Sequence, residues 1–176
     1  LVEMKPTWLW GGALSSGLLL AVAHRGEVWS LLAALPMLIF LLRHAPSAGA
    51  FGALVGVGES LAVYEVWFID YAAGSFAVVG FAGYRALMCW ILARYLSLHR
   101  PSPWVLGGLW IVCEALHAAL PFSVPNVVGE VLIDTPISGL ITLIGAWGVS
   151  GWLVGSICVM VNRETSFRNV FFIVMP

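Results

Sequence analysis

Long apolar runs separated by short polar segments dominate the pattern along this chain. The hydrocarbon core of a bilayer is about 30 Å thick and needs roughly 20 helical residues to cross it. The runs show no period-2 alternation, so helices are predicted rather than the strands of a membrane barrel. Six spans are expected, over Thr7–Ala23, Val28–Leu42, Ala48 to about Tyr71, Ser75 to about Leu96, Trp104–Leu120 and Ile137–Val161.

These runs predict an all-α protein with one domain over residues 1–176, a polytopic transmembrane helical bundle. After the polar stretch NRETSFRN, the run VFFIVMP indicates the start of a seventh helix, which favours a longer native chain. Composition agrees with this class, because 61% of the residues are hydrophobic and only 10% are charged. The lipid bilayer is therefore the expected partner, and we expect no nucleic-acid partner.

The positive charges indicate an orientation for the bundle. In membrane proteins, Lys and Arg are in excess in the cytoplasmic loops. The segments on the side of the N-terminus hold most of them, so the N-terminus is predicted to be cytoplasmic. The loop at 121–136 is then exoplasmic, and its apolar character predicts a position at the membrane interface. The residues on the cytoplasmic side are Lys5, Arg43, Arg94, Arg100, Arg163 and Arg168.

Glu59 and Arg85 lie in neighbouring spans at equal distance from the turn between them. They should therefore lie at the same depth and form an ion pair, since pairing is how a membrane interior accommodates charges. A buried pair of this kind can specify helix register more than it stabilises the fold. A direct functional role for the pair is the alternative.

Glu65 and Asp70 are two further carboxylates near the exoplasmic end of the third span. Paired carboxylates can perform acid/base chemistry, but no nucleophile, metal signature or phosphate-binding loop accompanies them. A hydrated helix end is the competing interpretation. No metal site is predicted either. The spacing of Cys89, Cys113 and Cys158 fits neither a disulfide framework nor a zinc motif, so these cysteines are expected to pack in the core.

Glu114 and His117 lie three residues apart in the fifth span, so they share one face of that helix. There they can hydrogen-bond to each other or to a neighbouring helix. A histidine in a membrane helix can also bind the metal of a haem or a chlorophyll. His117 is therefore a candidate pigment or haem ligand, with helix packing as the alternative.

Several residues of the fifth and sixth spans resemble motifs of the apolipoprotein N-acyltransferase family. The fifth span, PWVLGGLWIVCEALHAALPF, is similar to the family pattern W-x-x-x-E-x-L-R-G followed by G-F-P-W, and the sixth is similar to P-L-x-x-L-A-x-x-G-x-Y-G-L-S. The upstream stretch FIDYAAG resembles the family turn S-x-H-D-Y-G-G. The matching motif residues include Trp110, Glu114, Pro121, Phe122, Gly145, Trp147, Gly148 and Ser150.

The resemblance implies a bundle that the family joins to a periplasmic nitrilase-like domain. That domain uses Glu, Lys and Cys to move an acyl chain from phospholipid to a lipoprotein, and it would follow the seventh helix. No catalytic residue can be carried over to this chain. Bound phospholipid and a bacterial inner membrane are implied. Where the family has Arg-Gly, this sequence has His117 and Ala118, which puts the family's reaction in doubt.

Two functions follow from these observations. In the first, the chain is a non-catalytic accessory or assembly subunit of a larger membrane complex, such as a respiratory or photosynthetic one. In the second, it is the N-terminal membrane half of an acyltransferase that acts on lipoproteins. A small transporter, with Glu59, Glu65, Arg85 and Glu114 as a polar path, is a third and weaker alternative.

Overall fold

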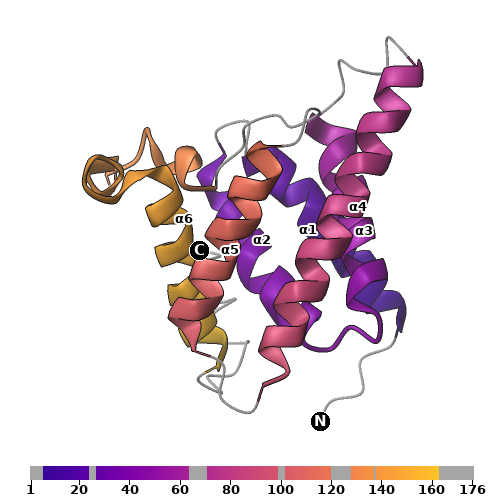
Figure 1. Ribbon diagram of the computed structural model, residues 1–176, viewed down its shortest axis with the longest axis horizontal. Helices are drawn as coiled ribbons and strands as arrows, with labels where there is room; N and C mark the ends of the chain where they lie inside the picture. The colour runs from indigo at the N-terminus through magenta and orange to yellow at the C-terminus, as the bar shows by residue number, and fades with distance from the viewer. Residues whose placement is uncertain are drawn as a thin grey trace.

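The computed structural model describes residues 6–23, 27–63, 71–98, 102–119, 128–136 and 138–162, and every regular element within them is a helix (Figure 1). The predicted all-α class is therefore confirmed for the described residues. The elements are α1 (Pro6–Ala23), α2 (Val28–Leu42), α3 (Ala48–Val63), α4 (Tyr71–Leu96), α5 (Pro103–Ala118), the short 3₁₀ helix η2 (Val128–Leu132) and α6 (Ser138–Asn162).

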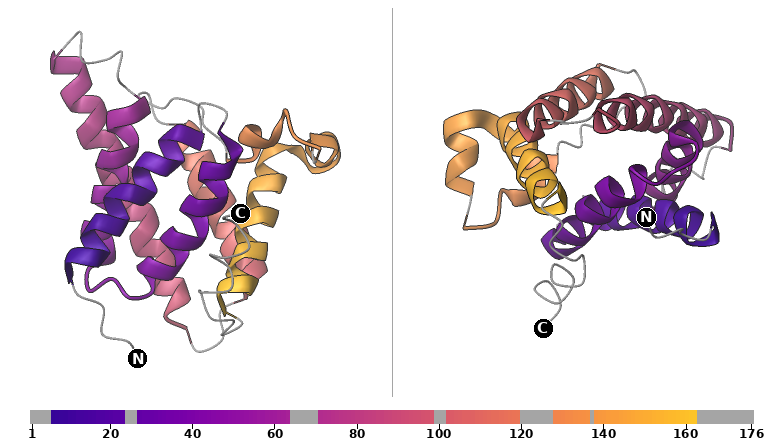
Figure 2. Two further views of the ribbon diagram at one scale, coloured as in Figure 1. Left: turned by 180° about the vertical axis from the view of Figure 1, so that it is seen from behind. Right: turned by 90° about the horizontal axis from the view of Figure 1, so that it is seen from below.

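The helices pack in two groups. In the first, α3 packs along both α1 and α4, and in the second, α5 and η2 pack on α6. The helix α2 lies against α1 and also reaches α6, so it links the two groups (Figure 2). By contrast, α4 and α5 touch only over a short stretch.

Glycines let the helices of the first group approach closely. A Cβ atom added to Gly52 of α3 would overlap the backbone of α4 at Arg85, and one added to Gly17 of α1 would overlap the backbone of α3 at Val55. Close approach through small residues is the usual way in which membrane helices associate, because lipid tails are as apolar as the helices themselves.

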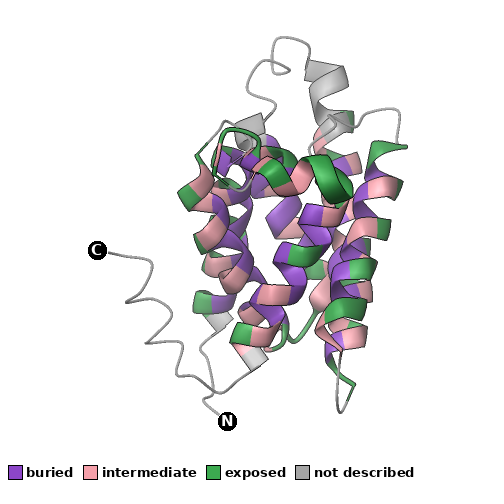
Figure 3. Cartoon of the chain, turned by 90° about the vertical axis from the view of Figure 1, so that its left-hand side faces the viewer, coloured by how far each residue is buried: buried purple, intermediate pink, exposed green. Residues whose placement is uncertain are grey.

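Buried and exposed residues are interspersed along the helices of the bundle (Figure 3), and large apolar side chains are among both. Phe51 and Trp110 are buried, whereas Trp8, Trp29 and Phe76 are each more than 70% exposed. Exposed apolar surface of this extent marks a membrane or protein interaction surface. The outside of the bundle is therefore suited to contact with lipid.

The helix α2 has the predicted bounds and α4 is longer than predicted, whereas α5 and the described part of α3 end earlier than predicted. By length and composition, one of the described helices, Ser138–Val161, is long and apolar enough to cross a membrane. Three others are apolar but shorter: Thr7–Ala23, Val28–Leu42 and Pro103–Ala118. Six full-length spans are therefore not confirmed. In addition, α6 contains a break at Gly145, where the backbone has φ 73° and ψ 165°.

The break at Gly145 divides the predicted sixth span, Ile137–Val161, into two parts. A positive φ is readily adopted by glycine and strains other residues. The part of α6 before the break projects sideways from the bundle (orange in Figure 1). The apolar pattern continues through the break, so sequence periodicity alone could not reveal it.

The start of α4 also differs from the prediction, since the helix begins at Tyr71 rather than Ser75. The third span was expected to reach Tyr71, but the described part of α3 ends at Val63. Glu65, Asp70, Pro121, Phe122 and the predicted start of a seventh helix lie outside the described residues.

Candidate functional site

The carboxylate of Glu114 lies near the end of α5 and is buried, with 6% of the residue exposed. Its Oε1 atom accepts two hydrogen bonds of 2.9 Å, one from the indole Nε1 of Trp110 and one from the backbone nitrogen of Val128. Trp110 lies one helical turn before Glu114 on the same helix, whereas Val128 is the first residue of η2. Glu114 therefore fastens η2 to the end of α5.

Ser150 of α6 holds the same segment from the other side. Its Oγ accepts a hydrogen bond of 2.7 Å from the backbone nitrogen of Gly129. Gly129 must be a glycine for this packing, because an added Cβ would overlap the carbonyl oxygen of Ala146. Both of the first two backbone N–H groups of η2 are thus bound by buried side chains, which suits a helix N-terminus whose amides have no partner within the helix.

Trp110, Glu114 and Ser150 were singled out from the sequence as separate motif residues, and the structure brings them together around η2. We name the group Trp110, Glu114, Val128, Gly129 and Ser150 the η2 anchor. Loss of either side-chain acceptor would leave a buried backbone amide of η2 without a partner, at a cost of about 1–3 kcal/mol. The η2 anchor can therefore fix the position of η2 at one end of the bundle.

Close packing of α5 on α6 supports the η2 anchor. An added Cβ on Gly107 of α5 would overlap the carbonyl oxygen of Gly151 of α6. One turn later along α5, the side chain of Ile111 lies against Gly151. The two helices therefore meet backbone to backbone at Gly151, the residue next to Ser150.

Glu59 and Arg85 form a doubly hydrogen-bonded ion pair between α3 and α4. Arg85 Nε lies 2.7 Å from Glu59 Oε2, and Arg85 Nη2 lies 2.6 Å from Glu59 Oε1. Both residues are buried, at 0% exposure for Glu59 and 5% for Arg85. The matched depths predicted from the sequence are thus realised in a bidentate geometry, the stronger form of such a pair.

Neighbouring side chains of α4 complete the surroundings of the guanidinium group. The Arg85 Cζ atom lies 5.6 Å from the ring centre of Phe81 and 5.5 Å from that of Tyr84, distances typical of cation–π contacts. Arg85 Nη1 also lies 3.1 Å from the sulfur of Met88. These contacts hold the charge inside the bundle, away from the outer surface.

His117 packs against α4, and 4% of the residue is exposed. The ring of Tyr84 is stacked on the imidazole with centres 4.6 Å apart, and the ring of Phe81 meets it edge-on at 4.8 Å. These ring contacts show that His117 takes part in the packing of α5 on α4. Its role as a pigment or haem ligand stays a prediction.

Tyr84 is the residue of this region that the sequence analysis missed. Its hydroxyl donates a hydrogen bond of 2.9 Å to the carbonyl oxygen of Cys113 and so joins α4 to α5. The only signal in the sequence is an aromatic residue next to Arg85, which is too common to single out.

The remaining predicted motif residues play other parts. Gly145 forms the break in α6, and Trp147 is 44% exposed. A Cβ atom added to Gly148 would meet the side chain of Ile144. All three cysteines are buried, in line with the prediction of core packing. Among the described residues, no group of three His, Cys, Asp or Glu side chains is placed to hold a metal ion.

Comparison with known proteins identifies the family. No curated protein matches the chain. The family model described as the apolipoprotein N-acyltransferase N-terminal domain matches residues 15–159, which is most of the chain and includes the whole η2 anchor. The chain therefore belongs to the family of the apolipoprotein N-acyltransferase N-terminal domain.

Proposed function

We propose that this chain is a non-catalytic membrane module that positions a partner protein at the surface of a bacterial inner membrane. It would act as an accessory or assembly subunit of a larger membrane complex, with its N-terminus in the cytoplasm. The observation that carries the proposal is the η2 anchor, in which buried side chains of α5 and α6 hold the backbone of η2 at one end of the bundle.

The two sides of η2 and the turn after it suit a docking platform. Val128, Gly129 and Leu132 are buried, on the side of η2 that packs against the bundle. Glu130 and Asp134 are exposed, and Ile133 is 53% exposed. A rigid backbone that presents one large apolar side chain between two acids offers a partner both contact area and charge. Preorganisation of this kind reduces the entropy that binding would otherwise cost.

The other polar groups of the bundle support a structural role. Glu59 and Arg85 bind each other, Tyr84 joins α4 to α5, and Glu114 and Ser150 hold η2. Each of these groups connects two elements of the chain. A catalytic group must instead be directed toward a substrate.

The second candidate is the membrane half of an authentic apolipoprotein N-acyltransferase. The family match favours it, because the matching model describes the N-terminal domain of that enzyme. In this case η2 would support the enzyme's own catalytic domain rather than a separate subunit. The platform geometry is the same in both cases, and the two differ in whether the partner is covalently attached.

Native mass spectrometry of the protein from its own membrane, in mild detergent, tests the proposal. We expect the protein in a defined complex with other subunits, each a separate polypeptide. The charge reversal Glu130→Lys should weaken that complex. Arg94→Glu, on the exposed end of α4, is the matched control and should leave it intact. A single heavier chain that transfers an acyl group from phospholipid to a lipoprotein peptide would instead establish the second candidate.

A further inference from the structure

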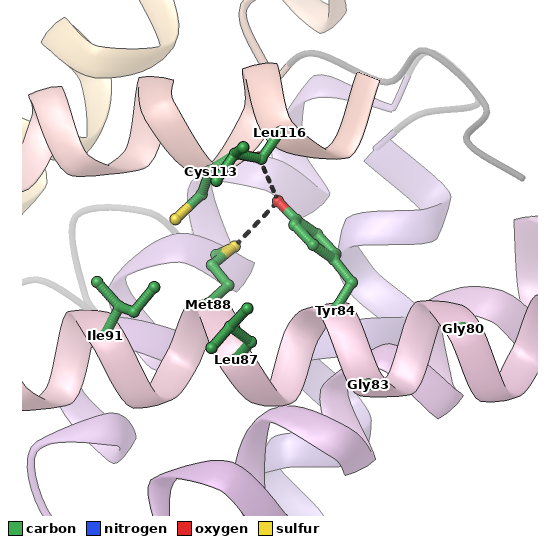
Figure 4. Close-up of a pocket in the computed structure, with 8 residues that line it drawn as sticks. All are labelled: Gly80, Gly83, Tyr84, Leu87, Met88, Ile91, Cys113 and Leu116. Atoms are coloured by element: carbon green, nitrogen blue, oxygen red, sulfur yellow. Dashed lines mark hydrogen bonds between the residues drawn. The ribbon is translucent and has the colours of Figure 1, made fainter. Parts of the chain in front are cut away.

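An apolar groove of about 350 Å³ lies between α4 and α5 (Figure 4). It is lined by α4 from Gly80 to Ile91 and by Cys113 and Leu116 of α5. Leu87 and Leu116 lie at its rim, and each is 55% exposed. The groove is therefore open toward the outer surface of the bundle, which carries large apolar side chains along its length.

The groove exists because α4 and α5 do not pack closely along this seam. Contact between them is short, whereas α4 packs along α3 and α5 packs along α6. Figure 4 shows Tyr84 reaching across from α4 to α5, where its hydroxyl donates to the Cys113 carbonyl. Gly83, directly before Tyr84 in the chain, contributes no side chain, and an added Cβ there would meet no atom within 4 Å.

The lining selects the chemical class of the occupant. None of the residues that line the groove is charged. The neighbouring Arg85 is directed to Glu59, and the proton of the Tyr84 hydroxyl is directed to the Cys113 carbonyl. A polar ligand would therefore lose its hydrogen bonds with water without replacing them. A hydrocarbon chain has no such loss.

The groove is too small to enclose a further protein helix. A helix with its side chains is about 10–12 Å across. The volume of about 350 Å³ equals that of roughly a dozen liquid water molecules, each of about 30 Å³. This space suits one extended hydrocarbon chain.

We propose that the groove between α4 and α5 holds one acyl chain of a bilayer phospholipid, which joins the two helix groups of the bundle. Lipid tails are as apolar as the lining, so a chain gains little hydrophobic free energy when it leaves the surrounding bilayer. The gain is the close van der Waals contact that an empty groove would forgo. The site should therefore recognise hydrocarbon and show little preference for a headgroup. This lipid has a structural role and is separate from the proposed platform at η2.

A phospholipid with a photoreactive diazirine on one acyl chain tests the proposal in vesicles of phosphatidylethanolamine and phosphatidylglycerol. We expect photolabelling at peptides that contain Met88 and Cys113, with either headgroup on the probe. Gly83→Ala should reduce this labelling partly, and Gly83→Leu should reduce it by about tenfold because its side chain fills the groove. Gly108→Leu is the matched control on α5, where an added Cβ also meets no atom within 4 Å, and it should leave labelling unchanged.

Neither substitution weakens α4 itself, because Ala and Leu both favour helix more than Gly does. The melting temperature of each variant in detergent provides the check, and if Gly83→Leu does not fold, Gly83→Ala decides the outcome. Equal labelling in the wild type and the folded Gly83 variants would overturn the proposal. Labelling spread evenly over the outer surface, or restricted to one headgroup, would also overturn it.

Discussion

The carboxylate of Glu114 and the backbone nitrogen of Val128 are 2.9 Å apart, although they are separated by 14 residues along the chain. This bond connects the end of α5 to the start of η2. The same oxygen also accepts a hydrogen bond from the indole N–H of Trp110. One buried atom therefore binds both a side chain of α5 and the backbone of η2. An unpaired carboxylate would be costly at this depth, and its position is explained by the donors around it.

Breaking the ion pair between Glu59 and Arg85 should destabilise the bundle strongly. Replacing one partner, as in Arg85→Met, leaves an uncompensated buried charge, which typically costs about 3–5 kcal/mol. The double variant Glu59→Met with Arg85→Met removes both charges and should regain most of this loss. Unfolding free energies in detergent would measure both. A double variant less stable than either single one would contradict this account of the pair.

The close approach of α5 and α6 predicts opposite effects at two adjacent glycines. Gly107→Ala should destabilise the bundle, because its Cβ would overlap the backbone of Gly151 and force the helices apart. Gly108→Ala should be neutral or stabilising by up to about 1 kcal/mol, since its Cβ meets no atom within 4 Å and Ala favours the helix. Melting temperatures measured side by side test the contrast, and equal shifts would argue against the packing of α5 on α6.

The break in α6 predicts a cost for any side chain at Gly145. Its φ of 73° is strained for other residues, so Gly145→Ala should lower the free energy of unfolding by roughly 1 kcal/mol. Gly139→Ala is the control, because Gly139 lies in the same helix with open space around it and no positive φ. If both variants were stabilised alike, α6 would be a continuous helix and the break would be absent.

The ion pair was predicted correctly because buried charges in neighbouring spans need a partner. The turn assumed midway between Glu59 and Arg85 was wrong, since that midpoint, Ala72, lies within α4. Trp110, Glu114 and Ser150 were identified separately through family motifs. Their common partner was not predictable, because the groups that they bind are backbone amides of Val128 and Gly129. Every residue except proline has a backbone N–H group, so the sequence does not indicate which amides bind a side chain.

The break at Gly145 and the groove beside Gly83 were missed for a related reason. Glycine is frequent in these spans, and nothing in an apolar pattern separates a glycine that bends a helix from one that permits close packing or opens a groove. The end of α5 was predicted at Leu120 rather than Ala118 because the apolar run continues beyond the helix. Hydropathy reports the environment of a segment and does not report where its hydrogen bonding ends.

Hydrogen exchange at η2 tests the central claim that Glu114 holds this segment to the bundle. Glu114→Leu removes the acceptor and leaves the Val128 amide and the Trp110 indole without it, at a cost of about 1–3 kcal/mol for each buried donor. Glu114→Gln keeps a carbonyl oxygen and should have a smaller effect. Thr142→Ala is the control, because that hydroxyl is exposed and donates only within α6, to Gly139.

We expect the amides of Val128 and Gly129 to exchange at least about tenfold faster in Glu114→Leu, as the loss of roughly 1.4 kcal/mol of local stability implies. Exchange in the Glu59–Arg85 region of α3 and α4 should stay as in the wild type. If the exchange of Val128 and Gly129 remained unchanged in Glu114→Leu while the bundle stayed folded, Glu114 would not anchor η2, and the platform proposed for this protein would have no structural basis.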